Sequence, residues 1–100
     1  MDKRFIFAAT KFEQVLLMIE AYVLIRVQPA RLEESSTHMQ TIKDEIKKVS
    51  GVKEIRGVLG RYDFVAIVET AGSQELGTLV TDTLRKIRGV AETETLVVGF

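Results

Sequence analysis

The fold of this chain is decided by the stretch GVLGRYDFVAIVET, residues 57–70. Gly60 and Arg61 stand between two apolar, β-branched runs, which predicts a tight hairpin turn in which the glycine takes a positive φ. Side chains alternate along a strand. The strand after the turn therefore sends two apolar sets to opposite faces: Phe64, Ala66 and Val68, and Val65 and Ile67. Both faces of the sheet must then be covered, one by helices of this chain and the other by an added element or a second subunit.

Composition limits the class of protein. The chain has 100 residues, 46% of them hydrophobic and 28% charged, which indicates one globular domain. Lysines plus arginines and aspartates plus glutamates number 14 each, so no net field attracts a polyanion and we expect no direct nucleic acid binding. There are no cysteines, hence no disulfides. The early apolar run, residues 5–9, is too short for a signal or a membrane span. We expect a soluble, cytoplasmic protein.

The remaining pattern alternates between strand and helix. Apolar periodicity and turn residues predict strands over 21–28, 52–59 and 90–100, with helices over 31–49 and from Ser73 to Arg88. Ser35, Ser36 and Thr37 are all possible N-caps of the first helix, and Gly51 is its expected C-cap. Ser73 is the expected N-cap of the second helix.

Residues 1–20 form an expected N-terminal extension ahead of the domain at 21–100. Thr10 and Glu13 have the spacing of a capping box. An apolar stripe with helical spacing follows: Phe12, Val15, Leu16 and Ile19. Residues 5–9 form a short strand or an extended arm. The extension is either a packing appendage or an arm that docks on a neighbouring subunit.

An internal repeat gives the topology. Residues 47–52 match residues 85–90 in chemistry and in their position at a helix-to-strand junction. Two strand–helix–strand units joined by a hairpin predict an α+β fold, the ferredoxin-like β-α-β-β-α-β sandwich. Right-handed crossovers place both helices on one face. The other face carries Tyr22, Leu24 and Arg26, and its apolar surface predicts a homodimer with sheets packed face to face.

Residues 20–100 resemble the effector-binding domain of the Lrp/AsnC regulators, the RAM domain (regulation of amino acid metabolism). The motifs are Gly51-Val52, Gly60-Arg61-Tyr62-Asp63, and Gly89-Val90 followed by Thr93-Glu94-Thr95-Leu96. The resemblance implies a dimeric α+β barrel that assembles further into octamers or decamers. It also implies that amino acids or similar small effectors bind between dimers, at the hairpin loop and the last strand.

The chain departs from that family pattern in two places. Full-length regulators carry a helix-turn-helix module ahead of this domain, and residues 1–20 are too few to encode one. We therefore expect a stand-alone effector domain or a natural fragment, with full-length regulators as possible partners. The segment 29–51 is about two helical turns longer than usual, which lengthens the helix or forms a loop.

The residues that carry the effector hypothesis are those of the hairpin and the last strand. Backbone amides around Gly60, Arg61 and Tyr62 would hold an α-carboxylate, and Asp63 would orient an α-ammonium. Thr93 and Thr95 would meet the ligand side chain. Each has a plain structural alternative, since Asp is common in turns and Thr in strands. Glu94 is expected on the opposite face from the threonines, paired with Arg26 or Arg56 across the two packed sheets.

Catalysis is not favoured. His38 is the only histidine, no cluster has metal-ligand spacing, and no glycine-rich phosphate loop appears, so we expect no metal or cofactor. The leading hypothesis is an amino acid-binding and oligomerisation module that modulates transcription through assembly. The alternatives are a dimeric α+β barrel enzyme, such as a small monooxygenase, and a purely structural assembly domain. A monooxygenase needs polar groups in an intrasubunit cavity, where this chain offers aliphatic residues.

Overall fold

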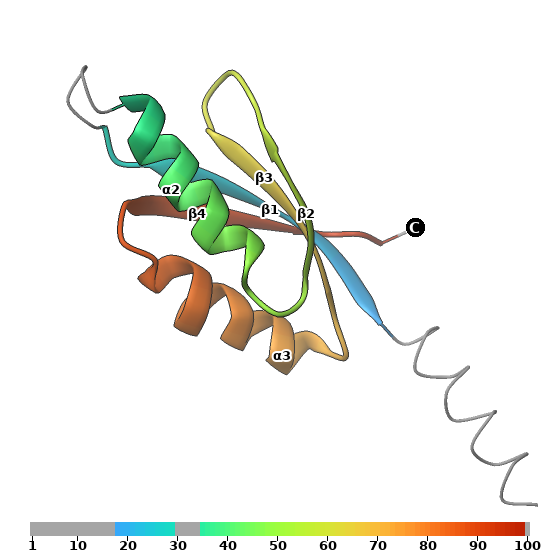
Figure 1. Cartoon of the computed structure of the whole chain (residues 1–100). Coiled ribbons are helices and arrows are strands. Elements are labelled where there is room, and N and C mark those ends of the chain that lie inside the picture. The colour runs from blue at the N-terminus through green and yellow to red at the C-terminus, as the bar shows by residue number, and fades with distance from the viewer. Residues whose placement is uncertain (1–17, 30–34, 100) are drawn as a thin grey trace, which may run out of the picture.

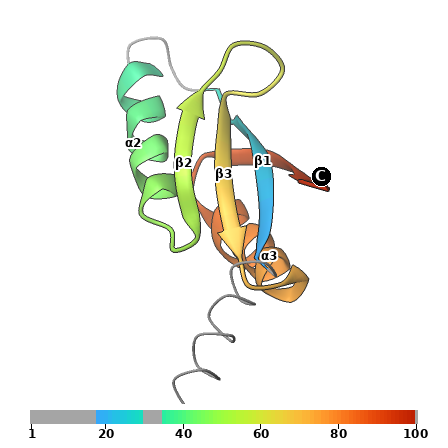
Figure 2. The ribbon, with the colours of Figure 1, turned by 90° about the vertical axis from the view of Figure 1, so that its right-hand side faces the viewer.

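A computed structural model describes residues 18–29 and 35–99, and these form a four-stranded antiparallel sheet with helices on one face (Figures 1 and 2). The strands are β1 (Ile19–Val27), β2 (Val52–Gly57), β3 (Phe64–Thr70) and β4 (Val90–Val97), and the main helices are α2 (Ser35–Lys47) and α3 (Ser73–Thr78). The sheet order is β2-β3-β1-β4. This is the predicted ferredoxin-like α+β fold. Within the described ranges, no helix is long and apolar enough to cross a membrane.

The central strands β1 and β3 alternate between two faces of the sheet. Ala21, Val23 and Ile25 are fully buried under the helices, whereas the intervening Tyr22 is 38% exposed. In β3 the same alternation buries Phe64, Ala66, Val68 and Thr70 and leaves the residues between them half-buried. β1 begins at Ile19, two residues before the predicted start at 21, because Ile19 and Glu20 continue the pairing with Thr70 and Glu69. We call the side under the helices the covered face.

The core lies between the covered face and the helices. Its fully buried large side chains are Val23, Ile25, Ile46, Val68 and Leu84. They come from both strand–helix–strand units, so neither unit buries its apolar stripe without the other.

α2 is described from Ser35, so Ser36 and Thr37 lie inside the helix and are not its N-cap, while residues 30–34 lie outside the described part of the chain. The chain turns after Lys47, and Gly51 has φ 98°, the left-handed conformation expected of the glycine that follows a helix. The Gly51 carbonyl then accepts a hydrogen bond from the Glu69 amide at 2.9 Å, which links this turn to the end of β3.

The second helix is less regular than the sequence predicts. α3 is followed by a π-helical turn, Leu79–Thr83, and a 3₁₀ turn, Leu84–Lys86. Ser73 is the first helical residue rather than the N-cap, which is Gly72 and makes no side-chain capping bond. At the far end Gly89 has φ 100°, and a Cβ there would lie 2.6 Å from Cδ1 of Ile42. The positive φ favours glycine at that position, and a Cβ there would also force the end of the Ile42 side chain to shift.

The hairpin between β2 and β3 is wider than predicted. β2 ends at Gly57 and β3 begins at Phe64, so residues 58–63 form the loop and the expected two-residue turn at Gly60-Arg61 is wrong. Gly60 does take the predicted positive φ, 138°. The Val58 amide donates to the Asp63 carbonyl at 2.9 Å and closes the base of the loop. The apolar Leu59 projects from it fully exposed.

Most of the predicted N-terminal extension lies outside the described residues. Residues 1–17, which hold the predicted capping box and most of the apolar stripe, lie outside the described residues. The predicted amphipathic helix does not reach the end of the extension, because Ile19 and Glu20 belong to β1 and Ile19 packs against the core.

Candidate functional site

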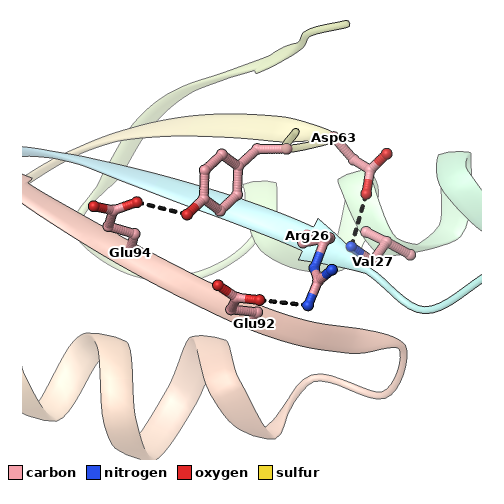
Figure 3. Close-up of polar contacts among 6 residues, drawn as sticks. Arg26, Val27, Asp63, Glu92 and Glu94 are labelled. Carbon is pink, nitrogen blue, oxygen red and sulfur yellow. Dashed lines mark hydrogen bonds and ion pairs between the residues drawn. The ribbon is translucent and has the colours of Figure 1, made fainter. Parts of the chain in front are cut away.

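The hairpin loop is anchored to the end of β1 by Asp63. The Asp63 amide donates to the Ile25 carbonyl at 2.9 Å, and one carboxylate oxygen, Oδ2, accepts the Val27 amide at 2.8 Å (Figure 3). The pairing of β1 with β4 shifts register between Arg26 and Val27, so the carboxylate satisfies a backbone donor at an irregular point of the sheet. Asp63 therefore has a structural role, and none of the described residues bonds to its second carboxylate oxygen.

A pocket of about 290 Å³ lies where α2 meets the loop. We call it the hairpin pocket. It is lined by Met39, Gln40, Lys43, Gly57, Val58, Leu59, Asp63 and Phe64. A cation, Lys43, and an anion, Asp63, share this pocket with apolar side chains. A zwitterion with an apolar side chain carries the complementary set of groups, and charge-assisted hydrogen bonds are about twice as strong as neutral ones.

The sequence indicated the loop but missed the helix that faces it. Met39, Gln40 and Lys43 of α2 line the hairpin pocket and were not among the predicted site residues. A signal was present, because positions 39 and 43 are four apart and share one face of a helix. What was missing was the knowledge that this face points toward residues 57–64.

Tyr62 lies on the side of the sheet away from the helices. Its hydroxyl donates to Glu94 at 2.5 Å, across β1 (Figure 3). That hydrogen bond to the carboxylate raises the pKa of the Tyr62 phenol above its ordinary value, with smaller contributions from desolvation and from the charge of Glu94. The Arg61 guanidinium lies 5.9 Å from the centre of the Tyr62 ring, within cation–π range.

Within one chain Glu94 does not pair with either predicted arginine, and its pairing across two sheets stays a prediction. Arg26 pairs with Glu92 instead (Figure 3), and Arg56 pairs with Glu54 of its own strand. The register explains this, because Arg26 stands opposite Glu92 in the β1–β4 ladder while Leu24 stands opposite Glu94.

The two threonines do not join the hairpin within one chain. Thr93 and Thr95 pair with Ile25 and Val23, so they lie on the covered face. The Thr93 hydroxyl accepts a hydrogen bond from Nε of Arg85 at 3.2 Å. In the sheet order β1 and β3 separate β4 from β2. The structure therefore brings Asp63 to the pocket and leaves the threonines apart from it.

The sheet side away from the helices carries the three residues predicted for a dimer interface. We call it the open face. Its residues in register are Tyr22, Leu24 and Arg26 of β1, Val65 and Ile67 of β3, and Glu92, Glu94 and Leu96 of β4. The apolar members form its centre. Charged residues lie on either side of them, with Glu92 and Glu94 on β4 and Glu54 and Arg56 on β2, which stand opposite Ile67 and Val65. Leu96 is 47% exposed.

Two further pockets lie among the helices. One, of about 590 Å³, lies between α2 and the 3₁₀ turn and includes His38, whose Nε2 is 3.1 Å from the Gln28 carbonyl oxygen. The other, of about 650 Å³, lies where β3 leads into α3. Among the described residues no three metal-ligating side chains gather into a cluster.

Comparison with known proteins identifies the family. Residues 20–99 match the model of the Lrp/AsnC ligand binding domain. The chain belongs to this family. An uncharacterized HTH-type transcriptional regulator of Pyrococcus abyssi is 33% identical over 86 residues, covering 86% of this chain and 55% of the relative. The chain thus spans about half the length of this curated relative, whose name describes a transcriptional regulator.

Solved structures show the same Lrp/AsnC fold. TTHA0845 from Thermus thermophilus is 33% identical with a TM-score of 0.70, and the match covers 82% of this chain and 94% of that one. A transcriptional regulator of Neisseria meningitidis, NMB0573, solved as a complex with L-Met, is 18% identical with a TM-score of 0.71, over 88% of this chain and 54% of that one. At that identity the second match shows the fold alone.

Proposed function

We propose that this chain binds a small amino acid-like effector and couples its binding to assembly, as a regulatory module acting in the cytoplasm. The observation that carries the proposal is the hairpin pocket, in which Lys43 and Asp63 line the same apolar recess. Membership of the ligand-binding family and the L-Met complex of NMB0573 support the choice of an amino acid.

The effector is held by its charged ends. The Lys43 ammonium takes the α-carboxylate. Gly60, Arg61 and Tyr62, whose amides the sequence suggested for this role, belong to the same loop but do not line the hairpin pocket. The second oxygen of Asp63 takes the α-ammonium, while the first keeps its bond to β1. Apolar pocket residues receive the side chain of the effector. Hydrogen bonds to charged groups contribute roughly 1.5–3 kcal/mol each.

Assembly proceeds through the open face. Two copies pack these faces together as a homodimer, and dimers associate further into an octamer or decamer. Thr93 and Thr95 contribute to the effector site only when a neighbouring dimer brings its last strand to the loop. A full-length regulator of the family can pack against the open face in place of a second copy, which gives a mixed assembly.

Calorimetry with each of the twenty amino acids tests the proposal. For an amino acid that binds, Lys43→Met should weaken affinity by roughly 1.5–3 kcal/mol, the scale of a charged hydrogen bond. Lys47→Met is the matched control, because Lys47 is an exposed lysine on the same helix outside the hairpin pocket. Its affinity should not change.

Asp63→Asn separates the structural role of this residue from its binding role. The asparagine oxygen can still accept the Val27 amide, so the fold should persist while the charge for the α-ammonium is lost. Affinity should fall by a similar amount, with little change in thermal stability. Unchanged affinity in both Lys43→Met and Asp63→Asn would place the effector elsewhere. If no amino acid bound at all, the structural assembly alternative would replace the proposal.

A further inference from the structure

The pocket of about 590 Å³ that includes His38 lies between the two helices of the domain. We call it the interhelical pocket. One wall comes from α2 and includes His38, Ile42 and Glu45. The other wall comes from the second helix, with Asp82 in its π-helical turn and residues 86–88 at its end. None of these residues lines the hairpin pocket, so the two pockets are separate sites.

One end of the interhelical pocket is basic. Lys86 and Arg88 line it, and the next residue, Gly89, lies against the His38 ring, since a Cβ on this glycine would be 3.3 Å from Cε1 of His38. The Gln28 amide donates to the Gly89 carbonyl at 2.8 Å, and Nε2 of His38 is 3.1 Å from the Gln28 carbonyl oxygen. A carbonyl oxygen only accepts, so Nε2 carries the hydrogen of this bond. The imidazole is thus held beside two cations, and this end favours an anionic group.

The opposite end of the interhelical pocket is acidic, with the carboxylates of Glu45 and Asp82. Thr83, the neighbour of Asp82, also lines the pocket beside the turn that follows α2, which places Asp82 toward the C-terminal end of that helix. Glu45 lies two helical turns beyond His38, about 10 Å along the axis of α2. Its one ion pair, with Lys48, is long at 3.8 Å and exposed. The two ends therefore differ in the sign of their charge.

The irregular second helix keeps the opposite charges of this pocket apart. In a regular α-helix a carboxylate and a lysine four positions apart are neighbours and commonly pair. Here a π-helical turn gives way to a 3₁₀ turn between Asp82 and Lys86, and the intervening Thr83 has φ −120° and ψ −64°, outside the α-helical region. None of the ion pairs among the described residues involves Asp82, Lys86 or Arg88. These charges can therefore bind groups of a ligand.

We propose that the interhelical pocket binds a free peptide of about three residues, with its terminal carboxylate at the basic end and its terminal ammonium at the acidic end. An extended chain advances about 3.3–3.6 Å per residue, so the two charges of a tripeptide are about 10 Å apart. A free amino acid carries both charges on one carbon and cannot reach both ends. Ile42 and Ile87 give the pocket an apolar surface for the peptide side chains. This second site goes beyond the effector function of the hairpin pocket.

Proton NMR of the full chain tests the proposal. His38 is the only histidine, so the hydrogen on Cε1 of its ring gives one signal from the pocket itself. Tri-alanine added at constant pH should shift this signal until it saturates. N-acetyl tri-alanine and tri-alanine amide each lack one terminal charge and should bind about fivefold more weakly, as expected for the loss of an exposed ion pair. Free alanine should leave the signal in place. No saturable shift with tri-alanine, an equal shift with alanine, or equal affinity for the capped peptides overturns the proposal.

Two substitutions locate the binding of tri-alanine. Lys86→Met removes a charge from the basic end and Asp82→Asn one from the acidic end, and each should weaken tri-alanine binding about fivefold. The matched controls are Lys47→Met and Asp44→Asn, since both residues are exposed on α2 and outside the interhelical pocket. Neither control should change the affinity. Unchanged affinity in both Lys86→Met and Asp82→Asn overturns the proposal. The amino acid titrations of the hairpin pocket are independent, because Lys86 and Asp82 do not line it.

Discussion

The two faces of the sheet are made by the same strands and have opposite characters. On the covered face Val23 and Ile25 of β1 are fully buried among aliphatic neighbours. On the open face their neighbours Tyr22 and Leu24 remain partly exposed, although they are also large and apolar. Charged residues border the open face, as in the pair of Arg26 with Glu92. The covered face is complete within one chain, whereas the open face has an apolar centre and a charged border.

This difference indicates which apolar surface is buried within one chain and which surface needs a partner to bury it. A soluble monomer rarely exposes a large continuous apolar patch. Interfaces between proteins commonly combine an apolar centre with a polar rim. The open face fits that description, and its paired charges leave few uncompensated groups to be buried in a dimer.

The largest effect is expected on the covered face. Ile25→Ala removes a fully buried side chain and leaves a cavity that the helices cannot readily fill. Such substitutions cost about 2–5 kcal/mol. Urea unfolding should be measured at a protein concentration low enough to dissociate a dimer. The free energy of unfolding should fall by this amount in Ile25→Ala and by much less in Ile67→Ala on the open face. Equal losses at that concentration would mean that the two faces do not differ in the isolated subunit.

The next effect is expected at the centre of the open face. Leu24→Asp removes one apolar burial, roughly 1.5–3 kcal/mol per subunit, and places a charge where the two sheets would meet. Sedimentation should show monomers or aggregates in place of the dimer. Leu59→Asp is the control, because Leu59 is apolar and fully exposed but lies in the hairpin loop, and it should leave the sheet dimer intact. A Leu24→Asp variant that stays a dimer of native stability would show that the interface lies elsewhere.

The smallest effect concerns the border of the open face. The bond from Tyr62 to Glu94 raises the pKa of the phenol, since ionised tyrosine loses its donor and meets the carboxylate charge. A raised pKa in the folded state means that the bond contributes fully below the ordinary titration range of tyrosine. Its contribution is lost as pH rises through the raised value. The pair is exposed, so little stability is at stake.

Absorbance titration in a Tyr22→Phe background isolates this phenol, because the chain has two tyrosines. Glu94→Gln should lower the pKa of Tyr62 toward its ordinary value. Glu92→Gln should lower it less, since the charge of Glu92 is the weaker influence. An unchanged titration in Glu94→Gln would mean that the bond does not persist in solution.

Periodicity and turn residues were sufficient to predict the arrangement of elements. The apolar alternation in residues 64–68 required a strand covered on both sides, and the repeat at 47–52 and 85–90 required two equivalent units. Both signals are local, and the fold follows from them by rules of handedness. The width of the hairpin could not be predicted in this way. It depends on Asp63 bonding to β1, a strand far away in the sequence.

Only part of the candidate site could be predicted from the sequence, because the rest depends on contacts between residues far apart in the chain. Gly60 and Asp63 lie in one motif, so the loop could be found. Lys43 reaches the pocket only because α2 crosses the sheet beside the hairpin. The face on which Thr93 lies depends on the register in which β4 pairs with β1. A shift of that register by one residue would move Thr93 to the other face of the sheet.

The π-helical turn at Leu79–Thr83 makes the second helix tolerant of a change in its length. Leu76 and Leu84 both face the sheet, yet they are eight positions apart. In a regular α-helix eight residues rotate about 80° beyond two full turns, whereas seven return almost to the starting direction. The wider turn absorbs the surplus residue and keeps Leu84 inward. Shortening this helix by one residue, for example at the exposed Thr81, would restore regular α-helical bonding without turning Leu84 away from the core. The helix thus accommodates two chain lengths with one packing.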